Sequence, residues 1–309
     1  MLATTAMLAL ATQNVSIPTR EIARDINGNA VNMPVVSIGT WISSKGEDPY
    51  QIVYDWLKLG GRGIDTALIY HDQAKVKQAI ADAGLSRDDV FITSKIPSCS
   101  QDEFITRKRV QSDLDALGTT YIDLMLIHEP IGTIQACPDT WQILSNLQKN
   151  GTLRAIGVSN FGAGLWTKAL QKLCGKNQDE CRVVPAVNQI RYNVFHHDET
   201  TIGYCKKYNI TVQAYSPLGG THSPRSVFKD KTIAPIATAH NVSAAQVALR
   251  WVVQRGDVLT VLSGNPAHQA NDGDLFGFAL TADEMKALDG IAGPFDDEVL
   301  EGKSDARER

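Results

Sequence analysis

Four side chains with complementary acid–base chemistry occur in order along the first half of the sequence: Asp65, Tyr70, Lys95 and His128. A free phenol, with a pKa of about 10, donates its proton slowly at neutral pH. A neighbouring ammonium group favours the phenolate, so Lys95 would make Tyr70 a better proton donor to a developing alkoxide. Asp65 would keep Lys95 charged and oriented, and His128 could hydrogen-bond a carbonyl oxygen. These residue types therefore indicate carbonyl reduction, provided that a hydride donor lies alongside.

Each of the four residues also has an ordinary structural explanation. Asp65 could cap a helix, and Tyr70 could pack beneath a loop. Lys95 could be a solvated strand end, and His128 a hydrogen-bonded residue at a rim. However, Lys95 and His128 directly follow strongly apolar runs, in ITSKIP and LMLIHEP, where a buried charge needs a partner. Asp65 is the natural partner for Lys95.

The elements that would position these residues repeat along the chain. Short apolar runs alternate with amphipathic stretches at a period of about 30–40 residues. Asn27-Gly28 predicts a hairpin between residues 21–26 and 29–33. Helices are expected over 48–58, around Val110, and after the N-cap Ser243. Eight later strands are expected, over 35–39, 63–65, 90–95, 123–128, 155–159, 186–189, 211–215 and 258–262.

This order of elements favours a single (β/α)8 TIM barrel of the α/β class with an N-terminal β-hairpin. Alternating strands and helices indicate a parallel sheet, because each parallel return needs a crossover. An open doubly wound sheet is the competing fold, but the first strand lacks a following Gly-x-Gly-x-x-Gly turn. In a barrel the C-terminal ends of the strands converge on one mouth, which would bring the four polar residues together.

The composition is that of one globular unit with flanking ends. The 309 residues are 43% hydrophobic, which is enough for a substantial core and argues against disorder. The net charge of −4 argues against a broad surface for nucleic acid or anionic membrane, and no apolar run approaches a membrane span. We expect a flexible extension over 1–14, a barrel over 15–294 and a charged tail over 295–309.

The N-terminal extension bears on localisation. Leu2 to Ala11 is short and apolar, and Ala9-Leu10-Ala11 is similar to a signal-peptide cleavage site. No Lys or Arg precedes Arg20, so the positive region of a secretory signal is missing. A cytoplasmic protein is therefore expected, with a signal peptide as the alternative.

The five cysteines are widely scattered, at Cys99, Cys137, Cys174, Cys181 and Cys205. An odd, scattered set predicts reduced thiols rather than a disulfide framework, with a pair between Cys174 and Cys181 as the alternative in an oxidising compartment. Neither Cys-x-x-Cys nor a Cys/His cluster with zinc-ligand spacing occurs, so no metal is expected.

With these four residues, three later segments carry a family resemblance. GVSNFG (157–162), VNQIRYN (187–193) and QAYSPLGG (213–220) follow the tetrad in order. From about Ile17 to Leu288 the chain resembles the aldo-keto reductase family, whose catalytic tetrad Asp65, Tyr70, Lys95 and His128 match in order and surroundings. A lone Ser-Asn would say little, but these segments together are highly specific.

The resemblance implies a nicotinamide cofactor lying extended across the barrel mouth without a Rossmann domain. Ser159, Asn160 and Gln189 would hydrogen-bond its carboxamide, although strand capping is an alternative role for the two amides. Tyr215 would stack on the nicotinamide ring, or else pack at the rim. The pyrophosphate path would be lined by Ser216, Leu218 and Gly219.

The segment after the eighth strand departs from the family pattern. Relatives commonly carry a Lys there, followed by an Arg that helps to hold the adenosine 2′-phosphate. Here Ser263 stands in place of the Lys, and His268, or less readily Gln269, takes the Arg position. Losing two fixed positive charges should weaken phosphate binding. NADP(H) remains the expectation from the family, with NAD(H) as a serious rival, and a protonated His268 would make 2′-phosphate affinity depend on pH.

The expected substrate pocket departs from the pattern as well. Glu129 follows His128 directly, where many relatives have a Trp. A carboxylate there would disfavour acidic substrates and favour polar or basic ones, unless Glu129 turns away to solvent. Trp41 lies where the family often places a pocket aromatic, with core packing as its alternative.

We therefore expect an NAD(P)H-dependent reductase of an aldehyde or ketone, with Tyr70 as general acid. A non-catalytic cofactor-binding sensor or regulatory subunit is the second hypothesis. A barrel aldolase that uses Lys95 as a Schiff-base nucleophile is the third. The expected partner is a small carbonyl compound rather than nucleic acid or membrane, and the expected state is a monomer or weak oligomer.

Overall fold

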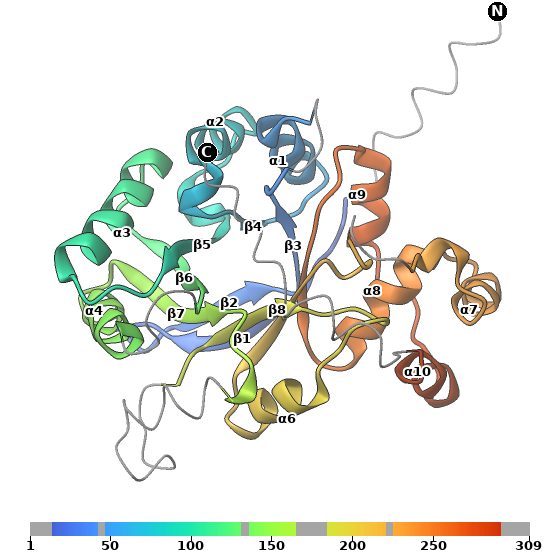
Figure 1. Ribbon diagram of the computed structural model, residues 1–309. Helices are drawn as coiled ribbons and strands as arrows, with labels where there is room; N and C mark the ends of the chain where they lie inside the picture. The colour runs from blue at the N-terminus through green and yellow to red at the C-terminus, as the bar shows by residue number, and fades with distance from the viewer. Residues whose placement is uncertain (1–13, 43–46, 131–135, 165–183, 221–224, 292–309) are drawn as a thin grey trace, which may run out of the picture.

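Eight parallel strands form a closed barrel in the computed structural model, which describes residues 14–42, 47–130, 136–164, 184–220 and 225–291. The strand order around the barrel is β10-β3-β4-β5-β6-β7-β8-β9, so every strand neighbours its successor in the chain (Figure 1). The predicted (β/α)8 barrel is confirmed. Its strands are β3 (Val36–Gly39), β4 (Gly63–Asp65), β5 (Phe91–Ser98), β6 (Ile122–Glu129), β7 (Leu153–Ser159), β8 (Val187–Arg191), β9 (Thr211–Tyr215) and β10 (Val258–Val261).

Helices surround the barrel and cover the outer faces of its strands (Figure 1). Their local signals are those of the sequence: Ser243 and Gln246 form a capping box at the start of α8, and Asp102 caps α3. The described helices are α1 (Pro49–Lys58), α2 (Gln73–Asp82), α3 (Glu103–Leu117), α4 (Cys137–Lys149), α6 (Glu199–Lys207), α7 (Ile233–His240), α8 (Ala244–Gln254), α9 (Pro266–Gly273) and α10 (Ala282–Asp289).

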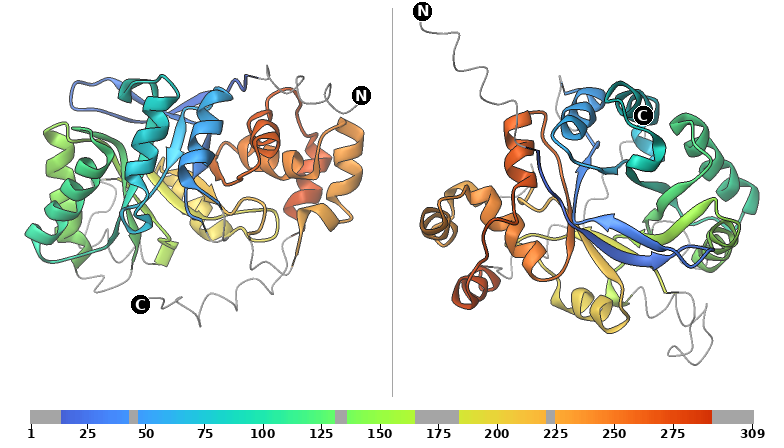
Figure 2. Two further views of the ribbon diagram at one scale, coloured as in Figure 1. Left: turned by 90° about the horizontal axis from the view of Figure 1, so that it is seen from above. Right: turned by 180° about the vertical axis from the view of Figure 1, so that it is seen from behind.

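The predicted hairpin closes one end of the barrel. It consists of the antiparallel strands β1 (Thr19–Arg24) and β2 (Ala30–Pro34), which lie across the barrel in Figure 2. Val31 and Met33 are fully buried and pack against barrel residues such as Leu124 and Val258. Because these contacts remove apolar surface from water at the centre of the barrel floor, they fix the hairpin in place.

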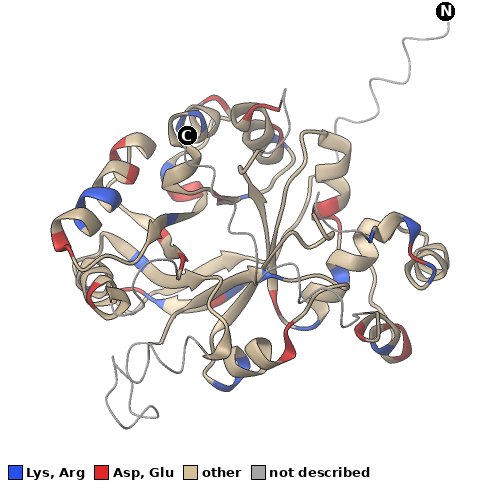
Figure 3. Ribbon diagram, in the orientation of Figure 1, with Lys and Arg blue, Asp and Glu red and all other residues tan. Residues whose placement is uncertain are grey.

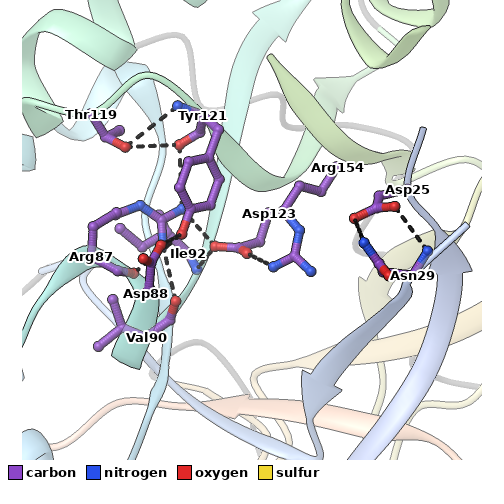
Figure 4. Close-up of polar contacts among 10 residues, drawn as sticks. All are labelled: Asp25, Asn29, Arg87, Asp88, Val90, Ile92, Thr119, Tyr121, Asp123 and Arg154. Carbon is purple, nitrogen blue, oxygen red and sulfur yellow. Dashed lines mark hydrogen bonds and ion pairs between the residues drawn. The ribbon is translucent and has the colours of Figure 1, made fainter. Parts of the chain in front are cut away.

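An ion cluster lies at the same end, where β6 and β7 begin. The Asp123 carboxylate is 1% exposed and binds two arginines, Arg87 Nη2 at 2.6 Å and Arg154 Nη1 at 2.7 Å (Figure 4). It also accepts a hydrogen bond from the backbone of Ile92 at 2.9 Å, and Arg87 stacks on Tyr121. A cavity of about 590 Å³ lies beside this cluster, lined by Asp25, Ile26, Asn27, Asp88, Thr120, Tyr121, Asn150, Gly151, Thr152, Leu153 and Arg154. Its walls belong to the amino-terminal end of the strands, where barrel residues contribute to stability.

The prediction that the cysteines are reduced thiols is wrong for one pair. Cys99 and Cys137 form a disulfide, with their Cα atoms 4.9 Å apart. Cys99 follows β5 and Cys137 begins α4, after the neighbouring strand β6, so the fold joins residues that are 38 positions apart. Cys205 is a buried free thiol. The alternative pair, Cys174 and Cys181, lies outside the described residues.

The charged residues are interspersed around the helices in the view of Figure 3. No helix in the described part of the chain is long and apolar enough to cross a membrane. The expected N-terminal extension (1–14) and charged tail (295–309) lie almost wholly outside the described residues, so the predicted domain boundaries stay predictions.

Candidate active site

The four tetrad residues meet at the carboxyl ends of three adjacent strands. Asp65 is the last residue of β4, Lys95 lies in β5, and His128 lies in β6. Tyr70 ends a short 3-10 helix, η1 (Leu68–Tyr70), which follows β4. The Lys95 ammonium lies 5.1 Å from the centre of the Tyr70 ring, and the rings of Tyr70 and His128 lie edge to face at 5.7 Å.

Lys95 is buried and paired as the sequence predicts. Its Nζ lies 2.5 Å from Asp65 Oδ1 and donates to the backbone oxygen of Thr66 at 2.9 Å. Burial lowers the pKa of Lys95, but the charge of Asp65 and its hydrogen bond are the main opposing causes, and the net shift of the pKa is upward. Lys95 therefore stays an ammonium group at neutral pH, which disfavours its use as a Schiff-base nucleophile.

The other oxygen of Asp65 is held by two amides. Gln189 Nε2 donates to Asp65 Oδ2 at 2.6 Å, and Gln213 Nε2 donates to it at 3.3 Å. Gln189 also donates to Gln213 Oε1 at 2.8 Å. Gln213 was not predicted from the sequence. The available signal was an amide side chain in the middle of a strand, β9, because a polar group buried there needs a partner within the barrel.

The acidity of Tyr70 differs from the sequence-based expectation. Burial raises its pKa, and the Lys95 charge lowers it only in part, so the net shift is upward. Desolvation of the phenolate is a larger effect here than the ammonium charge on which the expectation rested. Tyr70 is consequently protonated at neutral pH, and Lys95 acts on the phenolate only when the proton leaves.

His128 is a neutral imidazole in this environment. Burial, aided by the nearby Lys95 charge, lowers its pKa to about 3. Its ring makes no hydrogen bond within the described part of the protein, and Nδ1 is buried without a partner. An unengaged neutral imidazole beside Tyr70 is able to donate a hydrogen bond to a carbonyl oxygen.

One amide joins three strands at the rim. Asn160, with φ of 63°, follows β7 and donates from Nδ2 to Glu129 Oε1 at 2.7 Å and to the His128 backbone oxygen at 3.1 Å. Its Oδ1 accepts from the Tyr215 hydroxyl at 3.0 Å. Glu129 is half-buried and bound to Asn160, so it does not turn away to solvent.

The remaining hydrogen-bonding capacity here matches a primary carboxamide. Gln189 Oε1 has no partner among the described residues, and Asn160 Oδ1 keeps a second lone pair. Ser159 Oγ lies 3.2 Å from Asn160 Nδ2, whose two protons point to Glu129 and His128, so the Ser159 hydroxyl keeps its own proton to donate. Two acceptors and one hydroxyl donor complement the two N–H donors and one oxygen of a nicotinamide carboxamide. The donor set therefore fits this cofactor.

The turn after β9 has an unusual backbone. Ser216 has φ of 50° and Gly219 has φ of 101°, and the Gly219 amide donates to the Ser216 oxygen at 3.0 Å. Arg191, at the end of β8, donates to the Gly219 oxygen at 3.2 Å. Leu218 packs against the core and anchors this turn.

The remaining predicted residues lie around the same rim. Trp41 follows β3, is 54% exposed, and packs its ring 4.8 Å from that of Tyr70. Core packing is therefore not its role. Ser263 follows β10 and His268 lies exposed in the first turn of α9. No contact joins Ser263 or His268 to the tetrad in the described residues, and their place at the adenosine end of the cofactor stays a prediction.

A family model described as the aldo/keto reductase family matches residues 35–292. The chain belongs to this family. An aldo-keto reductase of Mycolicibacterium smegmatis is 36% identical over 279 residues, covering 90% of this chain and 92% of the relative. The glyoxal reductase of Bacillus subtilis is 33% identical, covering 88% of this chain and 95% of the relative. Among solved structures, a Bombyx mori aldo-keto reductase in complex with NADP is 30% identical with a TM-score of 0.78, covering 90% of this chain and 94% of that one.

As an aldo-keto reductase, the chain is an oxidoreductase of the kind that binds a nicotinamide cofactor and acts on carbonyl groups. The barrel, the resemblance and the enzyme class expected from the sequence are confirmed.

Proposed function

We propose that this aldo-keto reductase reduces an aldehyde or ketone to an alcohol, with Tyr70 as general acid. The observation that carries the proposal is the convergence of a protonated Tyr70, a charged Lys95 and an unengaged neutral His128 on one mouth. The bound nicotinamide would supply the hydride to the carbonyl carbon. Every other step falls to side chains of the barrel.

Tyr70 would hold and deliver the proton. Because burial raises its pKa, the phenol keeps its proton until negative charge develops on the carbonyl oxygen. As the proton leaves, the Lys95 ammonium stabilises the phenolate, and Asp65 keeps Lys95 in place. His128 would donate a hydrogen bond to the same oxygen and orient the carbonyl group.

The cofactor would lie across the mouth. Ser159, Asn160 and Gln189 would hold the carboxamide, and the Tyr215 ring would support the nicotinamide. Farther along, the turn containing Ser216, Leu218 and Gly219 would line the pyrophosphate, and Ser263 and His268 would face the adenosine end.

NADP(H) is the favoured cofactor on family grounds, with NAD(H) as the rival. Ser263 and His268 supply hydrogen bonds without fixed charge, so they should hold a 2′-phosphate more weakly than two fixed cations would. Titration of the protein with NADPH and with NADH tests the cofactor preference. A clearly lower Kd for NADPH supports NADP(H), and equal Kd values for the two cofactors would remove the preference.

Replacing Tyr70 with phenylalanine tests the catalytic role. We expect Tyr70→Phe to lower kcat by about 10²- to 10⁴-fold while the Kd for NADPH changes little, because the variant lacks the proton but keeps the ring. Tyr121→Phe, at the opposite end of the barrel, is the matched control and should keep full turnover. Unchanged turnover in a folded Tyr70→Phe variant would show that Tyr70 is not the acid.

A further inference from the structure

Glu129 presents one anchored and one free carboxylate oxygen at the mouth. Its backbone ends β6, where it pairs with Ser98 of β5, and it directly follows His128. Oε1 accepts from Asn160 Nδ2 at 2.7 Å. In the part of the chain that the structure describes, Oε2 has no hydrogen-bond partner and no cation pairs with the carboxylate. The side chain is therefore fixed in place but only half satisfied.

The surrounding groups leave its charge uncompensated. The Lys95 ammonium is already paired with Asp65, and Arg191 is bound to the Gly219 oxygen. Glu129 and the Tyr215 hydroxyl bind the same Asn160 side chain, and burial together with the charge of Glu129 raises the pKa of Tyr215 to about 12. The groups that the structure places next to Glu129 are Asn160, which binds it, Ser98, which pairs with it, its chain neighbour His128, and Tyr215, on which its charge acts.

The charge of this carboxylate changes near neutrality. Burial raises the pKa of Glu129 to about 7, and the hydrogen bond from Asn160 opposes the shift only in part. His128 is neutral throughout this range, and Lys95 stays charged. Above neutral pH the mouth therefore gains a negative charge, and below it Glu129 is an uncharged acid.

We propose that Glu129 selects the substrate by charge: carbonyl compounds that carry a cationic group are preferred over those that carry a carboxylate. This inference rests on the proposed carbonyl reduction at the same mouth. A partly buried carboxylate without a counter-charge repels an anion and attracts a cation strongly, because little water separates the charges. The preference should strengthen with rising pH, as Glu129 ionises.

Three benzaldehydes of similar shape test the proposal. The probes are para-carboxybenzaldehyde (anionic), para-methylbenzaldehyde (neutral) and para-(trimethylammoniomethyl)benzaldehyde (cationic), whose charges do not change between about pH 6 and about pH 8.5. Comparing kcat/KM in the wild type and in Glu129→Gln cancels the intrinsic reactivity of each aldehyde. Glutamine keeps an oxygen to accept from Asn160, so the variant removes the charge and preserves the contact.

At about pH 8.5 we expect the ratio of kcat/KM for the cationic over the anionic aldehyde to be at least about tenfold higher in the wild type than in Glu129→Gln. At about pH 6 the ratios of the wild type and of Glu129→Gln should become similar, because Glu129 is then largely uncharged. Glu47→Gln, which removes an exposed charge beside Gly264 elsewhere on the rim, is the matched control and should keep the wild-type ratio.

The outcomes separate the two proposals. If both proteins reduce all three aldehydes and the ratio of kcat/KM for the cationic over the anionic aldehyde is the same in wild type and Glu129→Gln, the role of Glu129 is overturned. The proposed function would then remain intact. Failure of the wild type to reduce any aldehyde or ketone would overturn the proposed function and this inference with it.

Discussion

Lys95 and Asp65 form an ion pair inside the barrel, with 1% and 5% of their side chains exposed. The two residues lie on adjacent strands, β5 and β4, and a second carboxylate oxygen of Asp65 binds Gln189 and Gln213. The pair is thus one end of a buried polar network that reaches across the barrel to β8 and β9. Such a network holds Lys95 in one position beneath Tyr70.

We expect Asp65→Asn to lower both stability and turnover. The variant leaves the Lys95 ammonium buried without a counter-charge, which should cost about 3–5 kcal/mol in the free energy of unfolding. Turnover should fall because an unpaired lysine loses its proton more readily and no longer stabilises the Tyr70 phenolate. Chemical denaturation and steady-state kinetics measure the two effects.

The double variant Asp65→Asn/Lys95→Met separates these effects. It buries no unpaired charge, so it should recover part of the lost stability while turnover stays low. Recovery of turnover in the double variant would contradict a catalytic role for the pair.

The barrel was predictable because its signals are local. Each strand is a short apolar run, and residues such as Asp65 and His128 mark the ends of these runs directly in the sequence. Ser243 and Gln246 likewise form a capping box, a signal within four residues that marks the start of α8. Once the strands are placed in order, the closure of a parallel barrel determines which strand ends meet.

What the sequence did not reveal depends on distances across the fold. The Cys99–Cys137 disulfide joins the segments that follow two neighbouring strands, β5 and β6. The spacing of the two cysteines along the chain does not predict this pairing. The hydrogen bonds that join Asn160 to Glu129 and Tyr215 likewise depend on how the ends of β6, β7 and β9 pack together. The upward shift of the Tyr70 pKa was missed because it depends on burial, which neighbouring residue types do not specify.

We expect loss of the Cys99–Cys137 disulfide to destabilise the protein. The bond closes a loop with a sequence separation of 38. In the loop-entropy model, removing it raises the entropy of the unfolded chain and so lowers the free energy of unfolding by about 3–4 kcal/mol. Cys137→Ser should therefore unfold at lower guanidinium concentration than the wild type. A dithiol reductant should destabilise the wild type by a similar amount and leave Cys137→Ser unchanged. Equal stability of the oxidised wild type and the variant would refute this account.

We expect Asp123→Asn to be among the more damaging substitutions far from the mouth. Asp123 is 1% exposed and forms ion pairs with both Arg87 and Arg154. The variant therefore leaves both arginines without the carboxylate that they share. The free energy of unfolding should fall by about 3–5 kcal/mol. Asp88→Asn, which removes a carboxylate at the edge of the same cluster, should cost less than about 1 kcal/mol. Urea denaturation measures both losses. Similar losses in the two variants would show that the ion pairs of Asp123 with Arg87 and Arg154 contribute no more to stability than the exposed Asp88.

Asp272 should make stability depend on pH. It lies in α9, is 4% exposed, and its carboxyl has no hydrogen-bond partner within the described residues. Burial raises its pKa from 3.8 to about 7. The folded state therefore binds a proton more tightly than the unfolded state, so this contribution to stability is complete below the unfolded pKa and is lost as the pH rises to about 7.

Replacing Asp272 with asparagine should remove that loss. Relative to the wild type, Asp272→Asn should gain about 2–3 kcal/mol in the free energy of unfolding between about pH 5 and about pH 8, since each pKa unit corresponds to about 1.4 kcal/mol. Asp274→Asn, an exposed neighbour, is the matched control and should show no such trend. Urea denaturation at several pH values measures the difference. If the difference between Asp272→Asn and the wild type stays constant across this range, then Asp272 ionises in the folded protein as readily as in the unfolded chain.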